Sequence, residues 1–224
     1  MEKRHTLKVF DEELIKLKKA VKHMVEMVAG QLNDAIMAFS AIDYVLAEKI
    51  IENDRKINKQ QEAVDSCTLR LLALRQPMAR DLRHILTAAK MASNLERIAD
   101  YACTVAKRTL ELDEQDLALP MESIASMGRI GMEMLSQIGN AYVAIDAEEA
   151  IAVWRKDSEV DKVYSQVMQT LSQYMSQHSE CVEPCIALLS AARAMERIGD
   201  LITNLAEEVY FLATSKQYLP VETA

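Results

Sequence analysis

Residues that interrupt helices are scarce in this sequence, and so are aromatic side chains. Only 5 of the 224 residues are glycine and 4 are proline, while aromatic residues make up 5% of the chain. Glycine and proline are the least favourable residues in helix interiors, whereas Ala, Leu, Glu, Lys and Met are among the most favourable. Because half of the chain is hydrophobic, a substantial core can be buried. The composition therefore predicts an all-α protein.

An excess of positive charge is also missing, since the formal net charge is −8. Proteins that bind nucleic acid normally present a basic face to the phosphates. The charge therefore argues against nucleic acid and gives no support for direct docking on an anionic membrane. Residues 1–14 carry charges throughout, and the longest uncharged stretch, 134–145, is shorter than the roughly 20 residues that span a bilayer. We expect a soluble cytoplasmic protein that reaches a membrane only through protein partners.

Several catalytic and metal-binding motifs are absent. The sequence contains no G-x-x-x-x-G-K-[ST] phosphate loop and no G-x-S-x-G nucleophile turn. Its four cysteines lack the C-x-x-C spacing of zinc ribbons and redox loops, and its histidines have no spacing typical of ligands. We therefore expect no enzyme activity, and we interpret the cysteines as reduced thiols in a packed core.

Apolar residues recur every three or four positions between the prolines, which is typical of amphipathic helices. The pattern predicts six helices, near residues 7–41, 44–75, 78–113, 121–144, 147–178 and 182–214. Only two residues separate the helices of the first pair, and the same holds for the pair near 121–178. Connections this short predict antiparallel hairpins.

Internal repetition is the most informative feature of the chain. The segment Glu96-Arg97-Ile98-Ala99-Asp100 recurs as Glu196-Arg197-Ile198-Gly199-Asp200, an offset of 196 − 96 = 100. The second predicted helix of each half, near 44–75 and 147–178, matches at an offset of 103, which pairs Asp43 with Asp146 and Asp54 with Asp157. The repeat predicts a duplicated set of three helices, with one copy in residues 1–115 and the other in residues 116–224.

Each copy contains two acidic helical turns. Side chains four residues apart share one helix face, so Glu196 and Asp200 present two carboxylates to the same space. On a helical wheel, Asp157 and Asp161 fall within the apolar stripe of their helix, where a carboxylate needs a neutralising partner. Glu196 and Asp200 lie opposite the apolar positions and would by themselves form a solvated face. The same applies to their counterparts Glu96 and Asp100.

If the helices pack side by side, the acidic turns of one half meet and offer oxygen ligands alone. Such ligands suit Mg²⁺, Ca²⁺, Mn²⁺ or iron, and Zn²⁺ also accepts carboxylates. We therefore predict that Asp157 with Asp161 and Glu196 with Asp200 bind a divalent or trivalent cation. Arg97 and Arg197 offer an alternative counter-charge, although as neighbours of the glutamates they are expected to bridge to another helix.

Together, the motifs resemble the PhoU family. The resemblance rests on the run R-Q-P-M-A-R-D-L-R at 75–83, followed by the repeated E-R-I-[AG]-D, and it covers roughly residues 7 to 214. It implies two tandem three-helix bundles related by an internal pseudo-twofold repeat. It also implies metal sites on the bundle surface, as in some members of the family. The ligand positions that it implies are Asp54, Glu96, Asp100, Asp157, Asp161, Glu196 and Asp200.

Two residues depart from the family pattern. Asn58 replaces an acid and offers only a neutral amide oxygen, which predicts a weaker first site. Ala99 stands where the family often has glycine, which we expect to affect packing and not ligation.

The resemblance further implies a function. PhoU-like proteins are negative regulators of the phosphate-starvation response that connect the ATPase subunit of the phosphate ABC transporter to a sensor histidine kinase. We expect a homodimer that contacts such partners through Asp81, Arg83, Arg97 and Arg197. A PhoU-like paralogue that regulates another transporter and a metal-storage bundle remain alternatives. A carboxylate-bridged metalloenzyme is disfavoured, because no histidine lies three residues after Glu96 or Glu196.

Overall fold

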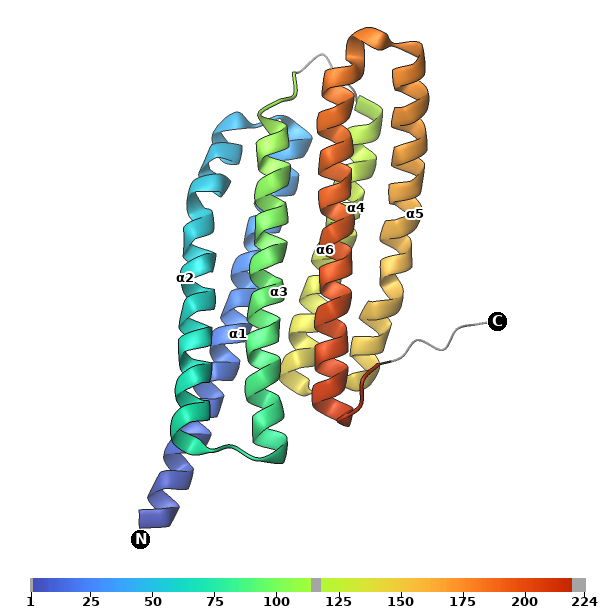
Figure 1. Ribbon diagram of the computed structural model, residues 1–224. Coiled ribbons are helices and arrows are strands. Elements are labelled where there is room, and N and C mark those ends of the chain that lie inside the picture. Colours follow the sequence, from blue (N-terminus) through green and yellow to red (C-terminus); the bar gives the residue numbers. More distant parts are fainter. Residues whose placement is uncertain (1, 114–117, 219–224) are drawn as a thin grey trace, which may run out of the picture.

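The computed structural model describes residues 2–113 and 118–218, and all regular secondary structure in this part of the chain is helical (Figure 1). The prediction of an all-α protein is confirmed. The predicted boundary between residues 115 and 116 lies outside the described residues. The helices are α1 (Glu2–Ala41), α2 (Tyr44–Arg75), α3 (Ala79–Thr109), α4 (Ala118–Ala144), α5 (Ala147–Gln177) and α6 (Val182–Thr214), with a short 3₁₀ helix η1 (Ser179–Cys181) before α6.

The helix ends differ from the prediction by a few residues. Helix α3 ends at Thr109 and not near 113, because Glu111 donates its backbone N–H to Arg108 O at 3.1 Å and turns the chain away from the helix. Helix α4 starts before the predicted position and includes Pro120 in its first turn. Proline is tolerated there because the first N–H groups of a helix have no partner within the helix.

The two predicted hairpins are present and have the same local geometry. Ile42 and Ile145 adopt left-handed backbone conformations with φ of 49° and 59°. Asp43 and Asp146 follow them, and each donates its backbone N–H to a carbonyl five residues earlier, at 2.9 and 3.0 Å. Both aspartate side chains then cap the next helix. Closing one helix and capping the next within two residues produces the tight antiparallel turn.

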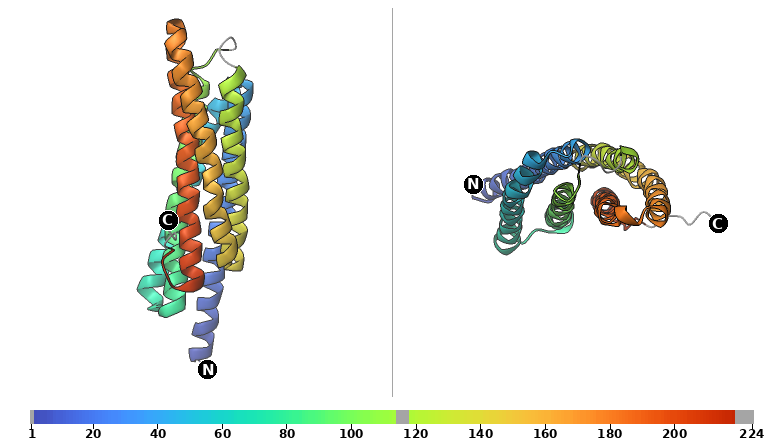
Figure 2. Two further views of the ribbon diagram at one scale, coloured as in Figure 1. Left: turned by 90° about the vertical axis from the view of Figure 1, so that its right-hand side faces the viewer. Right: turned by 90° about the horizontal axis from the view of Figure 1, so that it is seen from above.

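The six helices form a curved arrangement. Seen from above, α2, α1, α4 and α5 follow an arc, while α3 and α6 lie side by side inside it (Figure 2). The halves meet where α1 packs on α4 and α3 packs on α6. The two predicted three-helix bundles, α1–α3 and α4–α6, are therefore joined side by side. No helix in the described residues is long and apolar enough to cross a membrane.

Small residues allow the two halves to approach closely. A Cβ atom on Gly128 would lie 2.6 Å from Ile36 Cγ1, and one on Gly139 would lie 2.8 Å from Val25 Cγ1. Since the later residue of α4 meets the earlier residue of α1, these two helices run antiparallel. This crossing relates the halves by a pseudo-twofold rotation. Helices α3 and α6, which also pack on each other, are rich in buried alanines.

Candidate functional site

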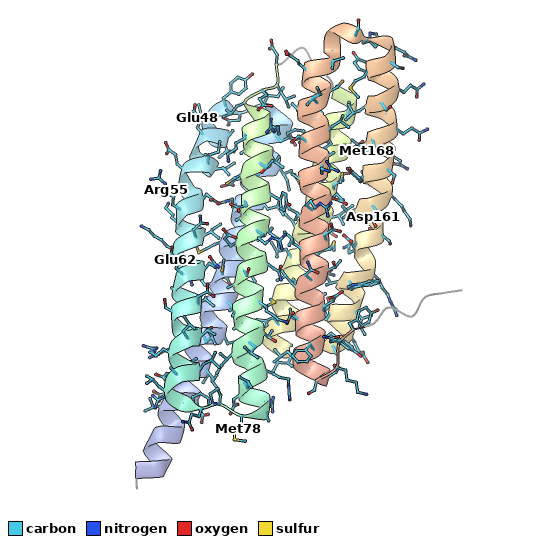
Figure 3. All side chains as sticks on the ribbon, viewed as in Figure 1. Glu48, Arg55, Glu62, Met78, Asp161 and Met168 are labelled. Atoms are coloured by element: carbon cyan, nitrogen blue, oxygen red, sulfur yellow. The ribbon has the colours of Figure 1, made fainter. Side chains whose placement is uncertain are left out.

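The acidic turns lie along two seams between neighbouring helices. We call the contact of α2 with α3 the first seam and the contact of α5 with α6 the second seam. Figure 3 shows Asp161 near the middle of α5, beside the second seam. The first seam contains Asp54, Asn58, Glu96 and Asp100, and the second contains Asp157, Asp161, Glu196 and Asp200.

In the second seam, Asp157 lies directly against the backbone of α6. A Cβ atom on Gly199 would overlap Asp157 Oδ1, so the glycine of E-R-I-G-D makes room for this carboxylate. Burial raises the pKa of Asp157 to about 7, with further contributions from the negative charges of Asp161, Asp200 and Glu196. The second seam therefore brings the negative charges of the other three carboxylates close enough to act on Asp157.

Glu196 lies deeper in the second seam than the helical wheel suggested. Its side chain is 20% exposed, and its buried Oε2 accepts no hydrogen bond. The pKa of Glu196 is raised, mainly by burial and then by Asp200, while Arg197 acts in the opposite direction. Arg197 Nε lies 3.5 Å from Oε2, but the geometry is not that of a hydrogen bond.

Arg197 does not bridge to another helix through any ion pair in the described part of the chain, so that prediction was wrong. Its Nη1 donates to Asp200 Oδ2 on the same helix at 2.8 Å. The long guanidinium side chain bends along the helix surface, which brings it to an acid three residues away. Arg97 in the first half is exposed, and its charge lowers the pKa of Glu96 against the stronger effect of burial.

The helical wheel was wrong about how exposed several carboxylates are. Glu96 and Glu196, expected on a solvated face only if their helices are taken alone, are half-buried and lie near acids of α2 and α5. Asp161, expected within an apolar stripe, is exposed. A wheel records angles about one axis and contains no information on how far the neighbouring helix extends over each face.

The first seam contains a residue that the sequence analysis missed. Gln31 of α1 is 8% exposed. Its Nε2 donates to Asp54 Oδ1 at 3.0 Å and to Ala99 O at 3.2 Å, and lies 3.2 Å from Cys103 Sγ. Burial, followed by the charge of Asp54, raises the pKa of the Cys103 thiol far above its usual range, so the thiol is neutral. The one available clue was a lone amide among the apolar positions of α1.

Whether the seams fit a metal ion depends on their oxygen donors. Glu196 Oε2 accepts no hydrogen bond, although Arg197 Nε lies 3.5 Å away, and this oxygen together with the carboxylate-only composition of the second seam suits a hard cation. In the first seam, Asn58 Oδ1 is also buried without a partner, but Asp54 already accepts a hydrogen bond. Within residues 2–113 and 118–218, no three His, Cys, Asp or Glu side chains are grouped so that they could hold an ion as they stand. Ligation would therefore require side-chain rotation.

The remaining candidate residues, Asp81 and Arg83, lie in the first turns of α3. Asp81 lines a pocket of about 240 Å³ together with Lys18, Arg80 and His84. Arg83 is half-buried, and its Nε has no hydrogen-bond partner. Both residues lie next to the α2–α3 connection, away from the two acidic seams.

The amino-acid sequence matches a family model and known proteins of one family. The model of the PhoU domain matches the chain twice, at residues 21–109 and 124–209. A phosphate-specific transport system accessory protein PhoU homolog from Caulobacter vibrioides is 37% identical over 214 residues, covering 95% of this chain and 93% of that protein. The phosphate-specific transport system accessory protein PhoU of Escherichia coli is 33% identical over 215 residues, covering 96% and 89%.

Solved structures agree with the sequence comparison. The crystal structure of PhoU from Pseudomonas aeruginosa matches with a TM-score of 0.89 and 32% identity, covering 92% of this chain and all 100% of that one. The crystal structure of the phosphate transport system regulatory protein PhoU from Streptococcus pneumoniae matches with a TM-score of 0.88 and 29% identity, covering 94% and 100%. The chain, with its repeated helical triplet and paired acidic seams, belongs to the PhoU family.

Proposed function

We propose that this chain is an accessory regulator of phosphate transport that acts by binding other proteins. The main support is the extent of the match to relatives named for that role, because the chain covers 93% of one relative and 89% of another and includes both repeats. A protein that binds one conformation of a partner more tightly than another shifts the partner's equilibrium without catalysing a reaction. We accordingly assign no catalytic residues.

In its full form, the proposal is negative regulation of the phosphate-starvation response. The chain would act in the cytoplasm as an adaptor between the ATPase subunit of the phosphate ABC transporter and a sensor histidine kinase, and would reach the membrane only through them. The end of the molecule that contains the α2–α3 connection supports partner binding. Met78 projects from this connection (Figure 3), and Leu74 and Met78 are 69% and 79% exposed. Exposed apolar side chains beside Asp81 and Arg83 are typical of a protein contact surface.

The test is a pull-down with the tagged full-length protein from phosphate-replete cells, followed by mass spectrometry. We expect the transporter ATPase or the sensor kinase to be captured, and we expect the double variant Leu74→Ser, Met78→Ser to lose that capture. Val45→Ser is the matched control, because Val45 is 78% exposed but lies at the other end of α2. Capture of neither partner by the wild type would refute the adaptor role. Capture of a different transporter would favour a paralogue with another client.

A homodimer is part of the same proposal. Light scattering of the purified chain measures its mass in solution directly. A monomer at micromolar concentration would remove the dimer from the proposed regulatory assembly.

A second candidate function is cation binding at the second seam. The observation that favours it is Glu196 Oε2, which is buried without a hydrogen-bond partner next to three other carboxylates. Asp157, Asp161, Glu196 and Asp200 would hold Mn²⁺, Mg²⁺, Ca²⁺, Zn²⁺ or iron through their oxygen atoms. Titration calorimetry with Mn²⁺ should show binding that Glu196→Gln weakens. A few ions per chain fits a regulator, whereas many ions per chain would instead indicate metal storage.

A further inference from the structure

The two halves differ at one buried position beside the acidic seams. The offset of 103 that relates the second helices extends to α1 and α4, because the two hairpin turns have the same geometry at Ile42 and Ile145 and bond back to Ala38 and Ala141. It pairs Gln31 of α1 with Met134 of α4, since 134 − 31 = 103. The structure supports this register. Glu133 Oε2 and Lys156 Nζ form an ion pair at 2.5 Å between α4 and α5. Their counterparts at the same offset, Gly30 and Asn53, line one pocket between α1 and α2.

Gln31 contributes a donor that connects three helices. Asp54 Oδ1 on α2 and Ala99 O on α3 are acceptors only, so the group between them must be the Gln31 amide nitrogen, which has two hydrogens. The side chain is buried, and hydrogen bonds to charged groups are among the stronger ones in proteins. The negative charge of Asp54 is therefore compensated by the protein itself.

Met134 cannot play that part in the second half. It is fully buried and its thioether has no hydrogen to donate. Asp157, the counterpart of Asp54, receives no hydrogen bond from any described residue, and instead lies against the α6 backbone at Gly199. The two halves thus differ at equivalent positions: Asp54 accepts an internal hydrogen bond from Gln31, whereas Asp157 accepts none from the described residues.

We propose that Gln31 locks α1, α2 and α3 of the first half together by pairing internally with Asp54, so that only the second seam takes a cation. A cation that approached Asp54 Oδ1 would meet the partial positive charge of the amide hydrogens, and the nearby Asn58 offers only a neutral oxygen. The pairing of Gln31 with Asp54 depends on the contacts of Gln31 alone. The restriction of the cation to the second seam rests on the cation binding proposed above.

The lock is tested by thermal unfolding of the full chain in the presence of a chelator. Gln31→Met introduces the residue of the other half, and we expect it to lower Tm by about 3–12 °C, the range for losing a hydrogen bond to a charged group in a protein of this size. Asp54→Asn should recover part of that loss in the double variant, because the uncompensated charge is then gone.

Gln60→Met is the matched control. Gln60 also connects α2 to α1, through a hydrogen bond of 3.3 Å to Ala20 O, but this acceptor is neutral. We expect Gln60→Met to lower Tm less than Gln31→Met does, and we expect its effect on Tm to add to that of Asp54→Asn in the double variant. The lock is overturned if Gln31→Met is no worse than Gln60→Met, or if its effect adds fully to that of Asp54→Asn.

The difference between the halves is tested with Mn²⁺ and the same chelator-treated protein. Calorimetric binding should persist in Asp54→Asn, weaken strongly in Glu196→Gln, and weaken in Met134→Gln, where the new amide supplies a donor near Asp157. Loss of binding in Asp54→Asn would overturn the assignment of the cation to the second seam. If the wild type binds no Mn²⁺, cation binding at the second seam and the cation function proposed above are both refuted. Thermal unfolding in the presence of a chelator still tests the pairing of Gln31 with Asp54 independently.

Discussion

Replacing Gly199 with alanine tests the geometry of the second seam, because it introduces the residue that the first half has at position 99. Two effects oppose each other. Alanine is about 1 kcal/mol more favourable than glycine inside a helix. The new Cβ, however, would overlap Asp157 Oδ1, and forcing an atom into a packed site costs about 1–3 kcal/mol. We therefore expect a net destabilisation of about 0–2 kcal/mol from these two terms.

The sign of the effect should depend on Asp157. In an Asp157→Ala background the overlap disappears, and the next contact of the new Cβ is Val160 Cγ1 at 3.5 Å, an ordinary van der Waals distance. Gly199→Ala should then stabilise the fold by about 1 kcal/mol through helix propensity alone. Gly30→Ala is the control, because a Cβ there meets nothing within 4 Å and should be stabilising in either background.

Urea unfolding measures these differences. Far-UV circular dichroism follows the helices, and the fluorescence of Trp154, the only tryptophan in the chain, follows α5 near the seam. If Gly199→Ala stabilises the wild type as much as Gly30→Ala does, Asp157 does not lie against α6, and the account of the second seam fails.

Two further predictions concern contacts outside the seams. Burial and the positive charges of Arg80 and Lys18 lower the pKa of His84. Its contribution to stability should therefore be fully present above its unfolded pKa and lost as the pH falls through the lower folded value; an NMR titration in which His84 protonates normally would contradict this. Lys90 Nζ pairs with Glu208 Oε1 at 2.7 Å between α3 and α6, but Lys90 is 60% exposed. Lys90→Ala should cost only about 0–1 kcal/mol in urea unfolding, and less at high salt; a larger, salt-independent loss would show that the pair is essential to the join between the halves.

The fold was largely predictable because its determinants are local or repeated. The three-to-four periodicity predicted the helices, and the aspartates at positions 43 and 146 are helix caps whose role depends on the next few residues alone. The offset between E-R-I-A-D and E-R-I-G-D exposed the duplication directly. The ends of α3 and α4 were less predictable, because a turn hydrogen bond and a proline in a first helical turn shift them by a few residues.

The site was less predictable because its chemistry depends on contacts between helices. Gln31 and Asp54 are 23 residues apart, and Gln31 and Ala99 are 68 apart, so no local pattern connects them. The difference between Ala99 and Gly199 was expected to matter for packing and not for ligation. In the structure, packing and ligation are linked at this position, because the side chain that packs against Gly199 is Asp157, itself a candidate ligand.

A duplicated framework can separate a structural role from a binding role, and single buried residues are enough to do so. The backbone turns, the caps and most acidic positions recur in both halves, so the repeat alone implies two equivalent sites. One amide on α1 changes that, because a carboxylate with an internal donor has less need of an external ligand, while Asp157, which receives no hydrogen bond from the described residues, lacks that compensation. In a regulator built this way, the first half supplies a stable frame. The second keeps Asp157 without an internal donor, and there the cation proposed above would act on the seam between α5 and α6.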